Sequence, residues 1–416
     1  MSVGFGAYRI SEKSQSHEKS LRLALDKGIR LIDTSSNYSN GDSERLIGKV
    51  LSDYNRDNLT IISKVGYIQG DNLEVVKGLQ KLNKAKDDHV VISDDLEHSI
   101  HPDFIEDQIY RSLDRLNTDY LDSYLLHNPE YYLKTENSNK EEYYRRIKLA
   151  FDKMEDLVDK GIIKSYGISS NTFIDPIDEH TSTNLEIVMG AARSVSKNNN
   201  FKYIQFPMNI IEMGALERQY GGQSLIELAH SYNLKTISNR PLNCFSEQGL
   251  LRLANYKVDE LYENELNADK LFNDCIQPLV IKWLEVREDE GDKLFDIPVM
   301  KQISSIWYKQ NSKDAVDQVF MGYFFPLIAR IWGNDLSPKE SQPFYDLYDH
   351  AVQFSLNNIN KRANMFHEQA IDKGLVNDSN KSLSQKVIEK YLGFGVDHVL
   401  VGMRAPEYVE DLSSFF

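Results

Sequence analysis

Cysteine is nearly absent from this sequence, and no stretch has the pattern of a secretory signal. Only two cysteines, Cys244 and Cys275, occur in 416 residues, which disfavours a disulfide framework and a metal site built from cysteines. The N-terminus carries no charged segment followed by a long apolar run, so we expect no secretory signal. The predicted compartment is therefore the cytoplasm, where thiols stay reduced.

A membrane-length apolar run and a basic block are missing as well. The most apolar stretch, residues 319–332, is too short to span a bilayer comfortably, and we expect it to form a buried helix. Acidic residues number 63 against 48 basic ones, a formal net charge of −15, and no Lys/Arg-rich block occurs. Binding to nucleic acid or to a membrane is therefore not expected. No spacing of His, Asp or Glu indicates a metal site either.

Short apolar runs alternate with amphipathic segments along most of the chain. The pattern predicts eight strands, at 3–8, 29–32, 59–64, 120–127, 162–168, 203–206, 234–238 and 398–401. Helical patterns separate most of them, so the predicted fold class is α/β, a (β/α)8 TIM barrel rather than an open doubly wound sheet. Gly4-Phe5-Gly6 does not continue into a full dinucleotide fingerprint, which also counts against a Rossmann domain.

Residues 67–100 interrupt this rhythm early in the chain. They lack strong periodicity and are rich in Asp, Lys and His, so we expect a long, partly exposed excursion. Three histidines lie in or next to it, His89, His98 and His101. Loop histidines of this kind are usually solvated, and we interpret these in the same way.

A second interruption, residues 243–381, is far longer than an ordinary barrel connection. Helical patterns run through 276–284 and 319–332, the second expected to kink at Pro326. The predicted domains are a barrel over 1–242 and 382–416 and a mainly helical insertion over 243–381. Because the insertion follows the seventh strand, we expect it on the catalytic face. It either roofs the site or serves stability or oligomerisation.

Four polar side chains come at or just beyond the ends of successive predicted strands: Asp33, Tyr38, Lys64 and His127. In a barrel these strand ends converge on one mouth. A tyrosine with a pKa of about 10 is a poor proton donor near neutrality, but a lysine cation lowers that pKa. A carboxylate would hold the lysine charged, and an imidazole can hydrogen-bond the hydroxyl and a substrate oxygen. Such a set can give a proton to a carbonyl oxygen while a hydride arrives at its carbon.

Six motifs in order along the chain carry a resemblance to a known family. They are Gly4-Phe5-Gly6-Ala7-Tyr8-Arg9, Ile32-Asp33-Thr34 with Tyr38, Ser43-Glu44 and Ile47-Gly48, Ile62-Ser63-Lys64-Val65, Tyr124-Leu125-Leu126-His127, Tyr166-Gly167-Ile168-Ser169-Ser170-Asn171, and Val399-Leu400-Val401-Gly402-Met403-Arg404-Ala405-Pro406-Glu407. Across residues 1–245 and 382–416 the chain resembles the aldo-keto reductases. The resemblance implies a (β/α)8 barrel and hydride transfer between NADPH and an aldehyde or ketone. It implies Tyr38 as the general acid, Lys64 tuning it, Asp33 paired with Lys64, and His127 orienting the carbonyl.

The resemblance also implies a cofactor site for NADP(H), with NAD(H) not excluded. Ser170, Asn171 and Gln205 would hold the nicotinamide carboxamide, whose amide needs both donors and acceptors. The other expected cofactor contacts are Gly6, Ala7, Asn239, Arg240, Pro241, Leu242, Gly402, Met403 and Arg404.

Four of these positions depart from the family pattern. Asn239 stands where the family usually has an aromatic that stacks on the nicotinamide, and Arg240 brings a cation that could meet the pyrophosphate. Gly402-Met403 replaces a common Lys-Ser pair. Arg404 is then the remaining candidate for the 2′-phosphate of the adenosine.

Two alternatives stay open. One is a cofactor-binding regulatory or scaffold protein, in the manner of the potassium-channel beta subunits, with the insertion docking a protein partner or a second copy. The other is a barrel enzyme with unrelated acid–base chemistry, in which the four residues would be a coincidence. Fold alone does not decide between them, because one barrel hosts many functions.

Overall fold

The computed structural model describes residues 1–81, 89–246, 249–286, 294, 297–333 and 336–416. The chain forms two compact units. Met1–Ser246 and Ser379–Phe416 make up the first, which we call the barrel unit, and Glu247–Asp378 make up the second, the helical unit. The predicted boundaries for the insertion, 243–381, include residues 247–248, 287–293, 295–296 and 334–335, which lie outside the described residues.

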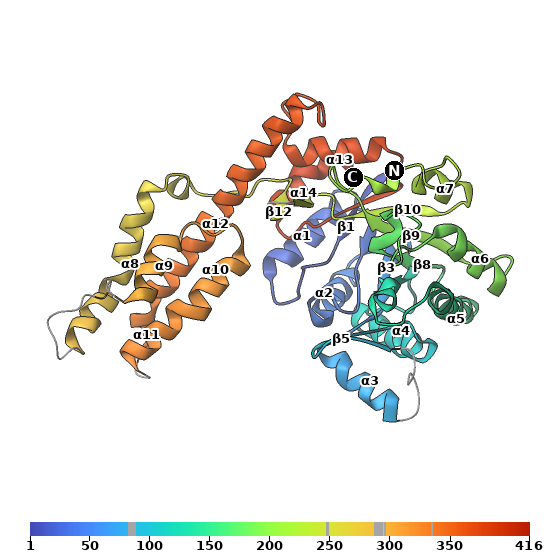
Figure 1. Cartoon of the computed structure of the whole chain (residues 1–416), viewed down its shortest axis with the longest axis horizontal. Coiled ribbons are helices and arrows are strands. Elements are labelled where there is room, and N and C mark those ends of the chain that lie inside the picture. The colour runs from blue at the N-terminus through green and yellow to red at the C-terminus, as the bar shows by residue number, and fades with distance from the viewer. Residues whose placement is uncertain (82–88, 247–248, 287–293, 295–296, 334–335) are drawn as a thin grey trace. The chain divides into compact units, whose positions relative to one another are not determined.

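Within the described part of the barrel unit, eight parallel strands close in the order β1, β13, β10, β9, β8, β7, β3, β2 (Figure 1). The predicted α/β TIM barrel is thus confirmed. The strands are β1 (Ser2–Gly6), β2 (Leu31–Asp33), β3 (Thr60–Val65), β7 (Ser123–His127), β8 (Tyr166–Ser169), β9 (Phe201–Pro207), β10 (Lys235–Asn239) and β13 (His398–Val401).

Helices surround this barrel, and their ends follow local sequence signals (Figure 1). Pro102 opens one of them, as predicted, in the first turn where a missing N–H costs nothing. Ser224 and Ser382 each form a capping box with the residue three positions later. The helices are α1 (Gln15–Asp26), α2 (Asp42–Leu51), α4 (Pro102–Leu116), α5 (Lys140–Asp159), α6 (Leu185–Val195), α7 (Leu225–Ser231), α13 (Leu383–Gly393) and α14 (Pro406–Leu412).

Apolar side chains fill the inside of the barrel. The cluster consists of Leu31, Ile62, Leu125, Ile237 and Leu400, which come from five different strands. The polar residues Asp33 and Lys64 come two positions after Leu31 and Ile62 on the same strands, and therefore on the same inward face. The apolar layer thus closes the barrel beneath a polar mouth.

The excursion over 67–100 is partly exposed, as predicted, but it contains regular structure, and the expectation that its histidines are solvated is wrong for His98. β4 (Tyr67–Gln69), β6 (Leu96–Ser99) and β5 (His89–Ser93) form an antiparallel sheet in that order, and α3 (Asp71–Lys81) follows β4. These strands are too short for periodicity to reveal them, and cross-strand pairing decides their structure. His98, on β6, is only 2% exposed, and its side chain contacts the main chain of β7. Residues 82–88 lie outside the described part of the chain.

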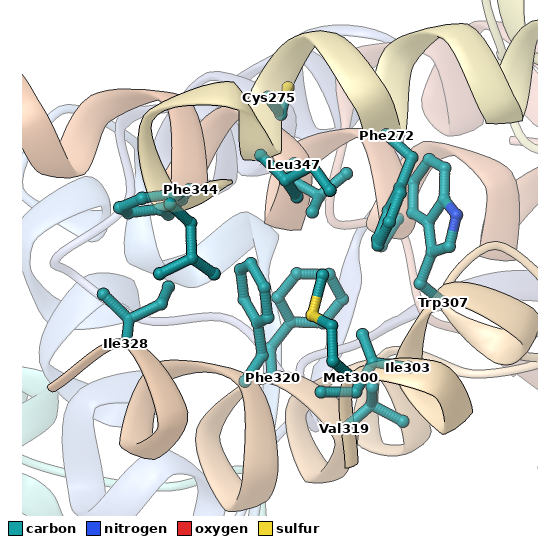
Figure 2. Packing of buried hydrophobic residues seen from close by; sticks show 14 of the residues in the cluster. Phe272, Cys275, Met300, Ile303, Trp307, Val319, Phe320, Ile328, Phe344 and Leu347 are labelled. Atoms are coloured by element: carbon teal, nitrogen blue, oxygen red, sulfur yellow. The ribbon is translucent and has the colours of Figure 1, made fainter. Parts of the chain in front are cut away.

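The helical unit has a hydrophobic core of its own (Figure 2). Phe272 stacks on Trp307 with ring centroids 5.7 Å apart, and Phe320 and Phe344 lie in the same cluster. The elements are β12 (Gly249–Arg252), α8 (Leu266–Glu285), α9 (Pro298–Ile306), α10 (Lys313–Val319), a π-helical turn (Phe320–Phe324), α11 (Phe325–Trp332) and α12 (Pro338–Asp372). β11 (Asn243–Ser246) belongs to the barrel unit.

The apolar stretch 319–332 is interrupted by the π-helical turn just before the predicted kink. Pro326 lies in the first turn of α11, where its missing N–H breaks no intrahelical bond. Phe320, Phe324 and Ile328 face the core and are at most 2% exposed. No helix among the described residues is long and apolar enough to cross a bilayer.

Candidate active site

Asp33, Lys64 and Tyr38 meet at the mouth of the barrel, as the order of the strands predicts. Lys64 Nζ lies 2.5 Å from Asp33 Oδ1 and 3.3 Å from the Tyr38 hydroxyl. Its third hydrogen bond goes to the main-chain oxygen of Thr34, at 2.9 Å. Three acceptors match the three N–H groups of an ammonium, which indicates that Lys64 is charged. Tyr38 begins a short 3₁₀ turn, Tyr38–Gly41, in the connection between β2 and α2.

Burial dominates the protonation of this group. It raises the pKa of Asp33 and lowers that of Lys64, while the ion pair between them opposes both shifts. Burial also raises the pKa of Tyr38 well above its ordinary value, and the Asp33 carboxylate adds to that. The net shift of the Tyr38 pKa is therefore upward, whereas the sequence predicts a lowering by Lys64. Tyr38 carries its proton at all ordinary pH values.

His127, at the end of β7, completes the predicted group. Its ring lies edge-on to Tyr38 with centroids 5.9 Å apart, and its Nδ1 is 3.1 Å from Ser35 Oγ. Ser35 thus holds one ring nitrogen, and Nε2 donates to a substrate oxygen in the tautomer in which Nδ1 accepts from Ser35 Oγ. Burial lowers the pKa of His127 well below its ordinary value, and the charge of Lys64 acts in the same direction. The imidazole is therefore neutral.

An aromatic wall surrounds His127. Tyr67 of β4 lies edge-on to it at 4.7 Å, and Tyr131 lies edge-on to Tyr67 at 5.5 Å. His98 Nε2 is 2.7 Å from the main-chain oxygen of His127. Burial lowers the pKa of His98 to about 4, so it is a neutral donor that fixes this strand end. A Cβ at Gly66 would come within 2.5 Å of both the His127 oxygen and His98 Nε2, so only glycine fits there. Sequence patterns did not predict this wall, because β4 and β6 are too short to be recognised.

Gln205, as predicted, lies at the mouth, but its partner is Ser169 rather than Ser170. Ser169 Oγ donates to Gln205 Oε1 at 2.8 Å, and Gln205 Nε2 donates to Asp33 Oδ2 at 2.8 Å. Ser170 bonds instead to Thr183 Oγ1 at 3.1 Å and caps the 3₁₀ turn Asn171–Ile174. Side chains alternate along a strand, so Ser169 of β8 shares the inward face with Gly167, and Ser170 does not. The alternation of side chains along the strand is the sequence signal that would have placed Ser169 on the inward face.

Asn239 ends β10 beside this group, with Nδ2 3.4 Å from Gln205 Oε1. Its Oδ1 is buried and has no hydrogen-bond partner among the described residues. Arg240 follows in the left-handed region at φ 56°, with Nη2 3.3 Å from Asn171 Oδ1 and 3.4 Å from Glu212 Oε1. The buried Pro241 accepts a bond from the Tyr391 hydroxyl at 3.0 Å, which anchors this turn from behind. Leu242 next to it is 5% exposed.

The remaining predicted cofactor contacts lie where β1 meets β13. The main chains of Gly6 and Gly402 pack closely, since a Cβ on Gly6 would lie 3.4 Å from the Val401 carbonyl. Ala7 is fully buried, and its N–H donates to the main-chain oxygen of Asp33 at 2.9 Å.

The side chain of Met403 is fully buried too, so only its main chain reaches this edge. Arg404 is half-buried and lies near His17, whose pKa is lowered by burial and further by the Arg404 charge.

One buried carboxyl at the mouth was not predicted from the sequence. Glu130 follows β7 within the 3₁₀ turn Pro129–Lys134 and is 2% exposed. Its Oε1 accepts the Asn171 N–H at 2.9 Å, and its Oε2 has no partner among the described residues. Burial raises the pKa of Glu130 to about 7. A Glu in the sequence motif His-Asn-Pro-Glu carries no pattern that distinguishes it from an exposed turn residue.

Glu130→Gln is expected to stabilise the protein above neutral pH. The folded-state pKa of about 7 lies above the ordinary 4.5, so the native state binds this proton more tightly than the unfolded chain. The wild type therefore loses stability as the pH rises from about 4.5 through about 7, by at most about 3 kcal/mol, and a glutamine does not. Denaturant unfolding of both proteins at about pH 5 and about pH 8.5 measures this. A stability difference that is the same at both pH values would contradict the prediction.

The chain is similar to proteins of one known family along most of its length. The sequence model of the Aldo/keto reductase family matches residues 2–297. Aldo-keto reductase YhdN of Bacillus subtilis is 28% identical over 160 residues, 38% of each chain. D-arabinose 1-dehydrogenase of Saccharomyces cerevisiae is 31% identical over 172 residues, 40% of each chain. NADH-specific methylglyoxal reductase of Escherichia coli is 32% identical over 100 residues, 24% of this chain and 27% of that one.

These relatives are matched over less than half of their length, so their activities do not transfer directly. Among solved structures, a glycerol dehydrogenase from Gluconobacter oxydans aligns with 17% identity and a TM-score of 0.49, over all of this chain and 86% of its own. That score carries no weight here. The family match alone covers well over half of the chain, from β1 into the helical unit. The chain belongs to the aldo/keto reductase family.

Proposed function

We propose that this protein is an NAD(P)H-dependent oxidoreductase that interconverts an aldehyde or ketone and the corresponding alcohol, with Tyr38 as the general acid. The observation that carries the proposal is the contact of Lys64 Nζ with both Asp33 Oδ1 and the Tyr38 hydroxyl, at 2.5 and 3.3 Å. The cofactor, when bound, would supply or accept the hydride.

Tyr38 would deliver the proton. Its hydroxyl oxygen accepts from Lys64, and its own proton has no acceptor among the described residues. A neutral phenol is the form needed to protonate an oxygen that gains negative charge, and the ammonium next to it stabilises the phenolate as it forms. His127 would hold the same oxygen through Nε2. Asp33 keeps the ammonium in place and does not itself exchange protons.

Residues at the mouth fit a nicotinamide carboxamide, which needs donors and acceptors together. Asn239 Oδ1 is a buried acceptor without a partner among the described residues, and Gln205 and Ser169 lie next to it. We propose that these three, with Asn171, hold the carboxamide. In place of a stacking aromatic, Arg240 would meet the pyrophosphate, because its guanidinium faces the same side as Asn171.

The coenzyme preference is proposed to be NADPH over NADH. Arg404 is half-buried, and no hydrogen bond or ion pair of its side chain occurs among the described residues, so its charge is available for a 2′-phosphate. The Escherichia coli relative is named as NADH-specific, so the preference varies among proteins that this chain resembles. The proposed substrate is a small carbonyl compound or alcohol.

The test is a binding titration followed by turnover. NADPH and NADH fluorescence titrations of the wild type give two dissociation constants, and we expect the one for NADPH to be lower. NADPH oxidation is then followed with a mixed panel of aldehydes and ketones. Binding without turnover on any panel member would contradict the proposed reaction, and absence of binding would contradict the cofactor site.

The helical unit is proposed to be an insertion between β10 and α13, since the chain leaves the barrel unit after Ser246 and returns at Ser379. It has its own core, and α8 carries exposed apolar side chains at Leu266, Ile281 and Leu284. These features favour a second candidate function, in which the barrel binds the cofactor as a regulatory or scaffold protein and the helical unit docks a partner or a second copy. NADPH binding without turnover, together with a mass larger than that of one chain in light scattering, would support it.

A further inference from the structure

Glu130 is a buried carboxyl that the proposed proton transfer does not use. It connects two loops at the mouth, because it lies after β7 and its Oε1 accepts the N–H of Asn171, the first residue after Ser170, at 2.9 Å. Asn171 is held a second time, through its side-chain oxygen, by Arg240 Nη2 at 3.3 Å. Asn171 and Arg240 both belong to the proposed cofactor site.

Main-chain N–H groups, the Ser170 hydroxyl and the charge of Lys134 favour the ionised form of Glu130, and burial opposes it more strongly. The titratable and charged groups near it are Lys134 on its own turn, Tyr143 on α5 and Tyr67 on β4. Lys134 Nζ lies over the ring of Tyr131 at 4.8 Å, and no ion pair to Glu130 occurs among the described residues. A buried carboxylate without a paired cation costs free energy of folding.

We propose that Glu130 is a positioning residue of the cofactor site: its carboxylate fixes the main chain at Asn171, and its protonation loosens that segment and weakens cofactor binding. The part that concerns the cofactor rests on the proposed function, and the part that concerns Asn171 does not. A hydrogen bond from an N–H group to a carboxylate is stronger than one to a neutral carboxyl. We expect the difference to change the equilibrium between the bonded and the released state of the Asn171 segment by about fivefold. Because the pKa of Glu130 is raised by burial to about 7, this change falls within the physiological range.

The variant that tests the proposal is Glu130→Gln, which keeps the shape and an acceptor oxygen but cannot ionise. The matched control is Asp175→Asn, which removes a carboxyl that follows the same 3₁₀ turn, Asn171–Ile174, and has no hydrogen bond to Asn171. Hydrogen exchange at the Asn171 amide is measured on the ligand-free proteins between about pH 6 and about pH 8.5 and divided by the intrinsic exchange rate.

In the wild type and in Asp175→Asn, protection of the Asn171 amide should rise about fivefold as the pH increases through about 7. In Glu130→Gln it should be low and independent of pH. Equal protection in all three proteins, or protection that does not change with pH in the wild type, would overturn the proposal.

The second readout is NADPH affinity. It is expressed as the dissociation constant of Glu130→Gln divided by that of the wild type. In this ratio the effect of the cofactor's own ionisation cancels, because it is the same for both proteins. This ratio should rise about fivefold over the same pH range. A constant ratio with the expected exchange behaviour would overturn the cofactor half of the proposal. If the wild type binds no NADPH at all, the proposed function fails, while the exchange measurement still decides whether Glu130 positions Asn171.

Discussion

Tyr38→Phe should lower kcat for carbonyl reduction by about 10²- to 10⁴-fold, since the substitution removes only the hydroxyl that delivers the proton. The ring remains and keeps its edge-on contacts with Tyr8 at 5.0 Å and His127 at 5.9 Å. The dissociation constant for NADPH should change by less than about twofold, because none of the proposed carboxamide contacts involves Tyr38. Steady-state NADPH oxidation with the best substrate of the panel and a separate binding titration measure both quantities.

Tyr8→Phe is the matched control for this substitution. Tyr8 is 58% exposed and lies beside Tyr38, but no hydrogen bond of its hydroxyl occurs among the described residues. The turnover of Tyr8→Phe should stay within about twofold of that of the wild type. Equal turnover in Tyr38→Phe and the wild type would exclude Tyr38 as the general acid. A similar loss in both variants would mean that the hydroxyls matter through substrate binding rather than through proton transfer.

Lys64→Met is expected to cost about 3–5 kcal/mol of stability in addition to abolishing measurable turnover, because it leaves Asp33 buried without its cation. Lys64 is fully buried and Asp33 is 3% exposed, so water cannot take over the lost interaction. The double variant Lys64→Met with Asp33→Asn carries no charge at this place. It should recover much of the lost stability while turnover stays absent. Denaturant unfolding and NADPH oxidation on the same samples separate the two effects.

An exposed ion pair is the control for this experiment. Lys27 and Glu410 lie 2.8 Å apart with side chains 38% and 54% exposed, so Lys27→Met should cost no more than about 1 kcal/mol. If Lys64→Met were no more destabilising than Lys27→Met, the pair would not be a buried salt bridge in solution. If the double variant were as unstable as the sum of its single variants, the coupling between Asp33 and Lys64 would be refuted.

The sequence predicted the barrel and the positions of the four proposed catalytic side chains. Most of the eight strands are short apolar runs, three of which end at or next to Asp33, Lys64 and His127, and parallel strands in a barrel bring those ends to one mouth. Asp33 and Lys64 could therefore be placed together without coordinates. The charge pair follows from residue type, and the structure shows it at 2.5 Å.

Other properties of the site depend on contacts between residues far apart in the chain. The sequence indicated that Lys64 lowers the pKa of Tyr38, but partial burial of Tyr38 and the charge of Asp33 raise that pKa. The choice of Ser169 over Ser170 depends on which face of β8 looks into the barrel. The extent of β8 was predicted as 162–168, which left Ser169 outside the strand.

The sequence by itself determined the fold class, the family resemblance and the identity of the polar groups at the strand ends. Each of these depends on the order of residues within short segments of the chain. Only the tertiary structure decided the protonation of those groups, the three-stranded sheet that brings His98 against β7, and the burial of Glu130 beside Asn171. The physical reason is that desolvation and hydrogen bonding depend on which distant segments pack around a side chain, as when Asn171 supplies the N–H that Glu130 accepts across a separation of 41 residues.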